Sequence, residues 1–489
     1  MKAGDLLTIS PLIALTLAPV VVMLAAAFWR SHGLALGLTL AGLATTFGLL
    51  FVSASRTGRV VTPLVTMDAY ALFFIGLLTV ATAIVAILSW SYLRRLSVRP
   101  EEYYVLLLTA TLGGAALVAS THFASFFLGL EILSVSLYAL IVYPVHREDA
   151  VEAAVKYLVL AGATSAFLIF GMALVYAEAG TMSAAGVAAL VSTGLGSQQV
   201  IVTVGIVMLL VGVGFKLAVV PFHMWTPDVY EGAPAPVTAY VATVSKGAVF
   251  ALLLRYLLPV SSDTGSTLFL ALAAVAIASM LAGNLLALRQ DNVKRILAYS
   301  SIAHLGYLLV AFLASGERAG VAAGFYLVAY FATTLAAFGV VTVLSPADRD
   351  ADLMLDYRGL GARRPVLAAV FAVALFSLAG MPLTMGFIGK FVIVSAGAGA
   401  GLWALVIVLV VTSTIGLFYY TRLIVAMYVR RPESLELAGA GAGARVAAAG
   451  GAAGVVVLAS LTVFILVFGV YPTPLLRLVE HAVSTLPWP

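Results

Sequence analysis

Long apolar runs follow one another along the whole chain, and each is about long enough to cross a lipid bilayer as a helix. A spanning helix needs ~20 mostly apolar residues, and the sequence contains fourteen such runs. They cover residues 9–28, 33–53, 67–92, 104–120, 124–143, 153–177, 200–221, 237–258, 266–287, 295–314, 320–344, 365–396, 402–428 and 452–471. The runs are continuous rather than alternating, which argues against a transmembrane β-barrel.

The balance of residue types indicates the same class of protein. Of 489 residues, 63% are hydrophobic and 10% are charged, whereas a soluble domain carries roughly 25% charged residues. A soluble core cannot absorb so much apolar side chain, so lipid must be the solvent for most of the chain. The sequence therefore predicts an all-α integral membrane protein of about 14 transmembrane helices, forming a single polytopic membrane domain over residues 1–489.

Lysine and arginine in the loops predict the orientation of these helices. One set of alternate loops carries fifteen of them: Arg30, Arg94, Arg95, Arg99, Arg147, Arg289, Lys294, Arg295, Arg349, Arg358, Arg363, Arg364, Arg430, Arg431 and Arg445. The other set, with the chain ends, carries five: Lys2, Arg56, Arg59, Arg318 and Arg477. Because positive loops stay inside, we expect both termini on the outer, periplasmic side. The first run is too long for a cleaved signal peptide, and we expect it to remain as a helix.

Two stretches between the runs are expected to be loops. The longest polar stretch runs from Asp348 to Arg364, and a Gly/Ala-rich stretch runs from Ala438 to Gly454 before the last helix. Neither is long enough to form a soluble domain of its own.

Lysine is used differently from arginine in this chain. Of the six lysines, four lie inside or at the edge of apolar runs: Lys156, Lys216, Lys246 and Lys390. Arginine stays charged, whereas a desolvated lysine can lose its proton near neutral pH. The sequence thus separates titratable positive charge in the membrane from fixed positive charge in the loops.

One acid is placed in a comparable way. Among 21 Asp and Glu residues, only Glu131 lies in the middle of a long apolar run, within FFLGLEIL. A charge in the membrane costs at least ~2.5 kcal/mol on insertion scales, so it is rarely kept without a partner or a task. A buried lysine is the simplest partner, and we expect an ion pair with Lys216 or Lys156 that proton movement would rearrange.

Two of the runs contain helix breakers next to a lysine. Pro221 follows Lys216 by five residues in GVGFKLAVVPFH, and Pro382 precedes Lys390 in LAGMPLTMGFIGK. Proline breaks the helical hydrogen-bond ladder, and broken backbone at membrane depth survives only beside protein or water. Interrupted helices in two halves of one chain are typical of a transport site between inverted repeats.

A polar stripe is predicted on one helix of the second half. Ser300, His304 and Tyr307 are spaced by four and three residues and share a helical face, with Ser301 beside it. Histidine titrates near neutrality, so this face could pass protons, and Lys246 would stand near the end of the same line. The alternative is that the stripe only forms hydrogen bonds between helices.

Simpler interpretations stay open for five other residues. Lys156 lies near a helix start and could extend its amine to the membrane interface. His223 could cap a broken helix end as readily as it could transfer protons. Arg255 and Arg422 are each near an end of a run, where reaching to the interface is the expected behaviour, and Asp68 is expected to cap the third run.

Several signatures of bound cofactors are absent from the sequence. It contains no P-loop, no dinucleotide fingerprint, no His-Glu-x-x-His and no Gly-x-Ser-x-Gly. It also contains no cysteine, which excludes disulfides and thiolate-held metal clusters. We therefore expect no cofactor and no metal on this chain, and a membrane-embedded transferase is disfavoured because no acid cluster is present.

The stretch 221–238, PFHMWTPDVYEGAPAPVT, resembles a signature of the antiporter-like membrane subunits of NADH:quinone oxidoreductase, respiratory complex I. The Glu131 segment, residues 296–307 (ILAYSSIAHLGY) and residues 378–391 resemble the same family, so the likeness covers nearly the whole chain. The TPDVYEGAP form is similar to subunit N, which is called subunit 2 in organelles. The lack of a long amphipathic helix after Tyr471 argues against subunit L.

The resemblance implies a fold and a set of site residues. The fold has two inverted five-helix repeats with discontinuous helices 7 and 12; residues 1–100 would form three N-terminal helices, 104–258 and 266–428 the repeats, and 429–489 the C-terminal helix. The proton-transfer positions of the family fall on Glu131, Lys216, Lys246 and Lys390. From the residues themselves, Lys156, His223, His304, Ser300 and Tyr307 are additional relay candidates.

The resemblance also implies a function and partners. The chain would translocate protons, driven by electron transfer from NADH to quinone, in a bacterial inner or plasma membrane. FMN, iron–sulfur clusters and the quinone site would lie on partner subunits, among them the peripheral arm and membrane neighbours of the M, K and J types. A Na⁺/H⁺ antiporter subunit, a related membrane-bound hydrogenase or dehydrogenase subunit, and a purely structural linker are the alternatives.

Overall fold

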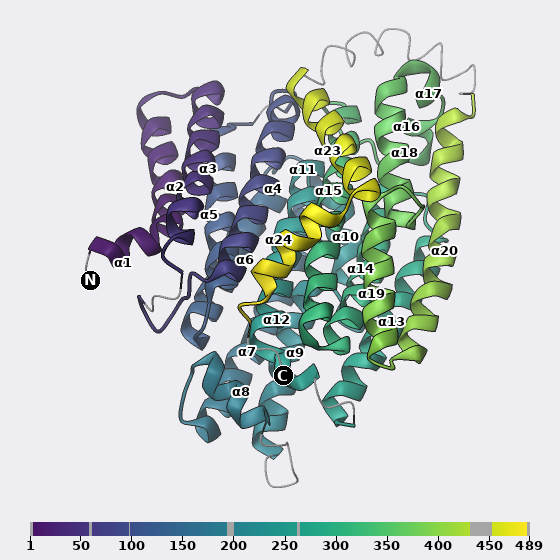
Figure 1. Ribbon diagram of the computed structural model, residues 1–489. Coiled ribbons are helices and arrows are strands. Elements are labelled where there is room, and N and C mark those ends of the chain that lie inside the picture. The colour runs from purple at the N-terminus through teal and green to yellow at the C-terminus, as the bar shows by residue number, and fades with distance from the viewer. Residues whose placement is uncertain are drawn as a thin grey trace.

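The computed structural model describes residues 3–57, 61–96, 98–192, 200–261, 265–430 and 452–486, and these residues are almost entirely helical (Figure 1). In chain order, the helices are α1 (Ala3–Thr8), α2 (Ser10–Phe28), α3 (His32–Ala54), α4 (Ala69–Leu93), α5 (Glu101–Ala119), α6 (Phe123–Ile141), α7 (Glu148–Ala179), α8 (Ala184–Ser192), α9 (Val200–Leu217), α10 (Trp225–Gly232), α11 (Ala235–Tyr240), the π-helix η1 (Val241–Ser245), α12 (Lys246–Ser261), α13 (Thr267–Ala287), α14 (Val293–Ala314), α15 (Gly316–Leu344), α16 (Met354–Tyr357), α17 (Leu360–Arg363), α18 (Pro365–Ala379), α19 (Met385–Gly399), α20 (Trp403–Tyr428), α23 (Ala452–Val470) and α24 (Thr473–Val483).

The membrane-spanning helices match the apolar runs of the sequence. Within the described ranges, 13 helices are long and apolar enough to span a bilayer, and α18 and α19 together make a further, interrupted span. The all-α membrane class is thus confirmed. The loop expected between Asp348 and Arg364 contains the short helices α16 and α17. Of the other expected loop, residues 438–451 lie outside the described residues, and α23 begins at Ala452.

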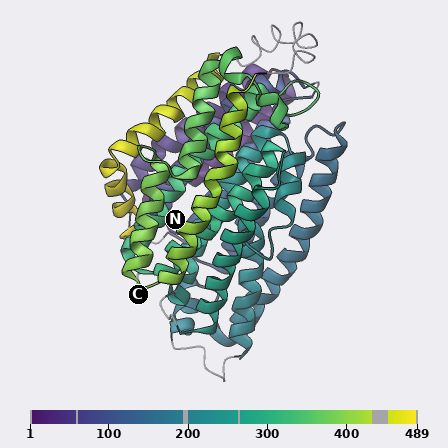
Figure 2. The same cartoon turned by 90° about the vertical axis from the view of Figure 1, so that its right-hand side faces the viewer.

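The helices form a bundle whose most buried members lie in the middle. The N-terminal helices α2 and α3 form one edge and α20 the opposite one (Figure 1), and Figure 2 shows the same long helices running side by side from a perpendicular direction. The segment from α11 to α12, together with α14 and α15, is almost wholly buried by the helices around it. These central helices carry Lys246, His304 and several other polar side chains considered below.

A short amphipathic helix, α24, follows the last span and crosses the outside of the bundle (Figure 1). It packs against α15 and α4. Its buried side chains Leu475, Val479 and Val483 are spaced by four residues, which gives α24 one apolar face. This helix therefore covers part of the outer surface of the two spans that it touches.

Small residues let neighbouring helices approach closely. A Cβ atom on Gly113 of α5 would collide with the backbone of α6 at Leu133, and Gly171 of α7 faces the backbone of α9 at Gly205 in the same way. In lipid, helices gain little from the hydrophobic effect and associate through such close packing. The tight α5–α6 and α7–α9 pairs fix the helices that carry Glu131 and Lys216.

Candidate proton-transfer site

The first predicted break separates α9 from α10. The chain leaves the helix at Ala218, whose φ is 61°, and resumes helical structure at Trp225. The freed backbone groups find side-chain partners: Val220 N donates to Ser279 Oγ at 2.9 Å, and the Trp225 indole donates to the Phe215 carbonyl at 3.0 Å. Both backbone groups thus have partners within the protein, as backbone in the membrane interior requires.

Lys216 lies in the last turn of α9 and is fully enclosed by protein. Its ammonium nitrogen donates to Ser134 Oγ of α6 at 2.7 Å and to the Tyr157 hydroxyl of α7 at 3.3 Å. Glu131 instead accepts a hydrogen bond from Ser165 at 2.6 Å. The expected direct ion pair between Glu131 and a lysine is therefore wrong for this conformation, because serine hydroxyls solvate both charged groups.

Lys156 occupies a more exposed position than the other three lysines. Its side chain is 43% exposed and forms ion pairs of 2.7 Å with both Glu152 and Asp228. The interpretation of Lys156 as an interface residue on α7 fits this position better than a role inside the bundle. The Nδ1 atom of His223 is buried, and no hydrogen-bond partner reaches it among the described residues. The structure thus shows neither capping nor relay contacts for that nitrogen.

Lys246 stands at the centre of the bundle, directly after the π-helix η1. Helical irregularities of this kind are frequent at functional sites. The Lys246 ammonium donates to Ser301 Oγ of α14 at 2.7 Å, and the Tyr330 hydroxyl of α15 donates to the same oxygen at 2.7 Å. The ring of Tyr230 lies 5.3 Å from the ammonium nitrogen. The predicted stripe therefore meets Lys246 through Ser301, not through Ser300.

His304 is the centre of a second hydrogen-bonded group. Its Nδ1 bonds the Tyr326 hydroxyl at 2.8 Å, and its Nε2 bonds the Tyr420 hydroxyl at 3.2 Å. Ser300 also bonds the Tyr420 hydroxyl. Tyr307, the third member of the stripe, accepts a bond from Asn284 at 3.0 Å. The whole stripe faces the protein interior, and each of its members bonds a neighbouring helix. These contacts are compatible both with a proton relay and with hydrogen bonding between helices.

The second predicted break lies between α18 and α19. Gly380 (φ 84°) and Leu383 (φ 69°) turn the chain out of the helix. Lys390, on α19, donates back across the break to the carbonyls of Leu378 and Ala379, at 2.8 and 2.9 Å, and to Ser413 Oγ at 2.7 Å. A cation at the carbonyl end of a helix is favourably placed, so Lys390 stabilises the interrupted end of α18.

A cavity and an aromatic ring adjoin Lys390. The cavity has a volume of about 350 Å³ and is bordered by Lys390, Phe391 and Ser413. The ring of Tyr307 lies 5.2 Å from the Lys390 ammonium nitrogen. Lys390 thus lies beside Tyr307, whose ring is 5.4 Å from the His304 ring.

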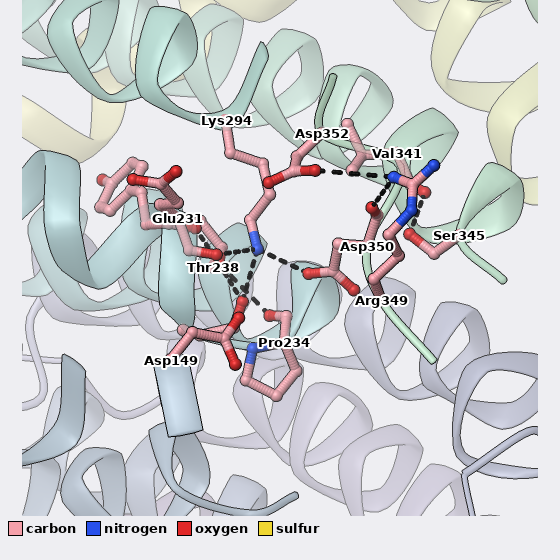
Figure 3. Close-up of polar contacts among 12 residues, drawn as sticks. Asp149, Glu231, Pro234, Thr238, Lys294, Val341, Ser345, Arg349, Asp350 and Asp352 are labelled. Atoms are coloured by element: carbon pink, nitrogen blue, oxygen red, sulfur yellow. Dashed lines mark hydrogen bonds and ion pairs between the residues drawn. The ribbon is translucent and has the colours of Figure 1, made fainter. Parts of the chain in front are cut away.

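A buried ion cluster lies at the end of the bundle where α14 begins (Figure 3). Lys294, which the sequence assigned to a loop, is wholly buried and pairs with Asp350 at 2.5 Å. Asp350 also accepts from the Tyr92 hydroxyl at 2.7 Å and lies 3.4 Å from Arg147. Burial alone would raise the pKa of Asp350, but the charges of Lys294 and Arg147 bring that pKa below its ordinary value.

A second buried ion pair joins α12 to the start of α4. Both terminal nitrogens of Arg255 donate to the Asp68 carboxylate, at 2.8 and 2.9 Å, and the Arg255 side chain is 8% exposed. The expectation that Arg255 extends to the interface is wrong, because it has this partner inside the protein. Asp68 also caps α4 by accepting from Ala71 N, as expected. Arg422, 40% exposed, pairs with Asp291 at 3.7 Å.

Sequence reasoning missed the neutral partners of the charged groups. They are Ser134, Tyr157, Ser165, Tyr230, Asn284, Tyr326, Tyr330, Ser413 and Tyr420. In the sequence, these partners could be suspected only because most of them are hydroxyl groups inside apolar runs. That feature is not specific, since other hydroxyl groups in such runs bond only a carbonyl of their own helix.

Comparison with known proteins supports one family. The family model for the NADH:quinone oxidoreductase/Mrp antiporter transmembrane region matches residues 120–416. NADH-quinone oxidoreductase subunit N of Nitrosospira multiformis is 52% identical over 98% of this chain and 96% of its own length. The same subunit of Methylococcus capsulatus is 44% identical over 100% of this chain and 97% of its own length.

A solved structure agrees with these sequence relatives. A chain of respiratory complex I from Thermus thermophilus with bound aureothin superposes with a TM-score of 0.79 at 30% identity, covering 96% of this chain and 98% of that one. The likeness therefore extends over the full length of both chains rather than over one motif. This chain belongs to the NADH:quinone oxidoreductase/Mrp antiporter transmembrane family.

Proposed function

We propose that this chain is the proton-translocating subunit N of a bacterial NADH:quinone oxidoreductase. The observation that carries the proposal is the placement of Lys216, Lys246 and Lys390 inside the bundle, each with its ammonium on a serine hydroxyl. Such amines can gain and lose a proton, whereas the arginines cannot. Relatives named subunit N at 44–52% identity over the full chain support this function over that of an antiporter subunit.

The proposed roles follow the order of these groups through the bundle. Glu131 and Lys216 form the first proton-loading unit, Lys246 and the His304 group relay, and Lys390 exchanges protons beside its cavity. Protonating one group changes the electrostatic cost of protonating the next, so the sites titrate as a coupled set. The energy comes from NADH oxidation and quinone reduction on partner subunits, which carry FMN, the iron–sulfur clusters and the quinone site.

The remaining assignments belong to the same proposal. The chain lies in the bacterial inner membrane with both termini on the periplasmic side, next to membrane subunits of the M, K and J types. Residues 104–258 and 266–428 form the two inverted repeats, each containing one interrupted helix. Positive residues in the loops and the two breaks at 218–224 and 380–384 support these assignments.

Substitution of Lys216 tests this function. In the assembled complex, Lys216→Met should lower proton translocation by about tenfold or more while FMN and cluster content stay normal, because methionine keeps the packing but cannot hold a proton. Arg422→Met, a change at a half-exposed helix end, is the control and should pump normally. Normal pumping by Lys216→Met would favour the structural-linker alternative. Purification without flavin and iron–sulfur subunits, together with Na⁺ transport, would favour the antiporter.

A further inference from the structure

We propose that Lys294 and Asp350 form a permanently charged clamp that positions the Lys246 relay. This inference rests on the proposed function. It deepens that function by adding two positioning residues that do not take part in proton transfer. The clamp lies where α14 begins, and Figure 3 shows the Lys294 side chain reaching toward Asp350. It acts on Lys246 through α10 and α14 rather than by contact.

Every donor of Lys294 is occupied. The ammonium donates to the Glu231 carbonyl at 2.7 Å, to the Ala233 carbonyl at 2.6 Å and to the Asp350 carboxylate at 2.5 Å. An ammonium group has three N–H donors, so these acceptors use all of them. The two carbonyls belong to the end of α10 and the turn into α11, where backbone acceptors lack helical partners and a cation is favoured.

Asp350 is fixed to the rest of the bundle as firmly as Lys294. Its carboxylate receives the Tyr92 hydroxyl from α4 and lies beside Arg147, which precedes α7. Its own loop folds back on α15, because Ala351 N donates to Ser345 Oγ at 3.0 Å. The side chains of Lys294 and Asp350 are 0% and 1% exposed, so water does not screen the pair.

The tethered elements are those that bring the relay residues together. Lys294 begins α14, which carries Ser301, and the Asp350 loop ends α15, which carries Tyr330. The carbonyls held by Lys294 end α10, which carries Tyr230. Ser301 accepts a hydrogen bond from the Lys246 ammonium, the Tyr230 ring lies 5.3 Å from that ammonium, and Tyr330 donates to Ser301. Ser301 lies seven residues beyond Lys294, so displacement of the start of α14 would be transmitted along about two rigid turns.

The pair is suited to holding charge rather than to passing protons. Lys294 is paired with a carboxylate, and Asp350 faces two cations that keep it ionised. Lys216, Lys246 and Lys390 each bond a serine hydroxyl instead, which can donate or accept. The chain thus contains two kinds of buried lysine. Lys294 is held in an ionic contact with a carboxylate, whereas Lys216, Lys246 and Lys390 each bond a serine hydroxyl.

A double substitution separates positioning from folding. Removing one member of a buried pair leaves an unpaired charge and destabilises strongly, whereas removing both is often nearly neutral. Lys294→Met/Asp350→Asn should therefore assemble with normal FMN and cluster content, and Arg147 keeps Asp149 as its partner. We expect proton translocation to fall by about tenfold, because displacement of positioning groups by ~1 Å is enough for such a loss.

The reactivity of a single introduced cysteine can report whether the clamp holds its turn closed, because the chain has no cysteine of its own. Ala233→Cys, at a fully buried site, should resist a soluble maleimide in the otherwise unchanged complex. In the double-substituted complex it should react about tenfold faster, because the α10–α11 turn opens locally. Ala115→Cys, buried in α5 away from the clamp, should resist labelling in both backgrounds.

The matched control is the other buried pair. Arg255→Met/Asp68→Asn removes an ion pair that is largely buried, with side chains 8% and 19% exposed, and no hydrogen bond joins it to a relay residue in the described part of the chain. This variant should pump normally. Normal pumping and an unreactive Ala233→Cys reporter in the Lys294→Met/Asp350→Asn complex would overturn the clamp while leaving the proposed function intact. Normal pumping by Lys246→Met would instead overturn the proposed function. Loss of assembly in the double variant would also count against the clamp, since it would show a folding role.

Discussion

The Lys216 ammonium lies 2.7 Å from Ser134 Oγ, one turn of α6 beyond Glu131. Positions three apart on a helix share a face, so the serine that accepts from Lys216 lies on the same face of α6 as the acid. Its hydroxyl donates to the Leu130 carbonyl at 2.5 Å while it accepts from Lys216. Ser134 therefore stabilises the charged form of Lys216 in the position that an ion pair would otherwise fill.

Removal of this hydroxyl should weaken proton loading at Lys216. A hydrogen bond to a charged group contributes about 1.5–3 kcal/mol, so Ser134→Ala should lower proton translocation by roughly tenfold with little effect on assembly. Coupled proton uptake in membrane vesicles measures the change. Ser136→Ala on the same helix is the control, because in the part of the chain that the structure describes its hydroxyl bonds only the Ile132 carbonyl. Equal effects of the two substitutions would show that Ser134 has no special role.

Tyr330→Phe should slow transfer away from Lys246. The substitution removes the hydroxyl that bonds Ser301 while it keeps the ring. A neutral hydrogen bond contributes about 1 kcal/mol, so the pumping rate should fall by roughly fivefold at unchanged quinone affinity. Tyr70→Phe serves as comparison, since the Tyr70 hydroxyl is also buried but bonds only the Ala251 carbonyl among the described residues. A fully active Tyr330→Phe complex would remove Tyr330 from the proposed path.

Lys390→Arg distinguishes a role for the positive charge of Lys390 from a role for its gain and loss of a proton. Arginine keeps a cation that can bond the Leu378 and Ala379 carbonyls, and the neighbouring cavity of about 350 Å³ leaves room for the larger side chain. Because arginine does not release its proton, the complex should assemble normally yet pump about tenfold less or worse. Heat stability and proton translocation measured on the same preparation test both parts. Retained pumping would mean that Lys390 acts through its fixed charge.

Arg255→Met should reduce stability rather than coupling. The change leaves the Asp68 carboxylate without its cation in a site that is 19% exposed, and breaking one side of a buried pair costs about 3 kcal/mol. The temperature of half-inactivation should drop, while the number of protons moved per electron stays constant. Combining the change with Asp68→Asn should recover most of the loss, since asparagine can still cap α4. A lowered number of protons moved per electron in the Arg255→Met complex would show that Arg255 affects proton translocation as well as stability.

The contribution of Asp350 to stability should be constant across the neutral range. Its pKa is lowered in the folded protein, so the stabilisation is complete above the ordinary pKa of about 3.9 and is lost only as pH falls through the lower, folded value. The difference in heat stability between the unchanged complex and the Lys294→Met/Asp350→Asn complex, which leaves no unpaired buried lysine to titrate, should therefore stay level from about pH 5 to 8. It should narrow only under more acidic conditions, and a change near neutrality would show that Asp350 titrates there.

Much of the fold could be predicted from the sequence because lipid imposes one simple requirement. Each span has to be a continuous apolar helix, so length and hydropathy locate it to within a few residues. The two breaks were also predictable, because Pro221 and Pro382 sit beside lysines in otherwise apolar runs. Which helices pack against each other could not be predicted in the same way, because the same types of apolar side chain face lipid and neighbouring helices.

The candidate site was predictable in its charged members but not in their partners. A lysine or glutamate in an apolar run is conspicuous, whereas the serine and tyrosine hydroxyls that bond them come from helices far away in sequence. Lys294 was misassigned for a related reason. It sits at a helix start among loop charges, and only the folded chain brings Asp350 over it, 56 residues further on.

The aromatic rings of Tyr330 and His304 lie 5.6 Å apart, and no direct hydrogen bond joins them within the described part of the chain. A continuous row of hydrogen-bonded groups across an energised membrane would act as a short circuit, because each proton returning through it releases about 2.3 kcal/mol per 100 mV. We therefore expect this gap to oppose proton return in the resting protein. A water molecule or a side-chain rotation would have to join the two groups before protons could pass between them.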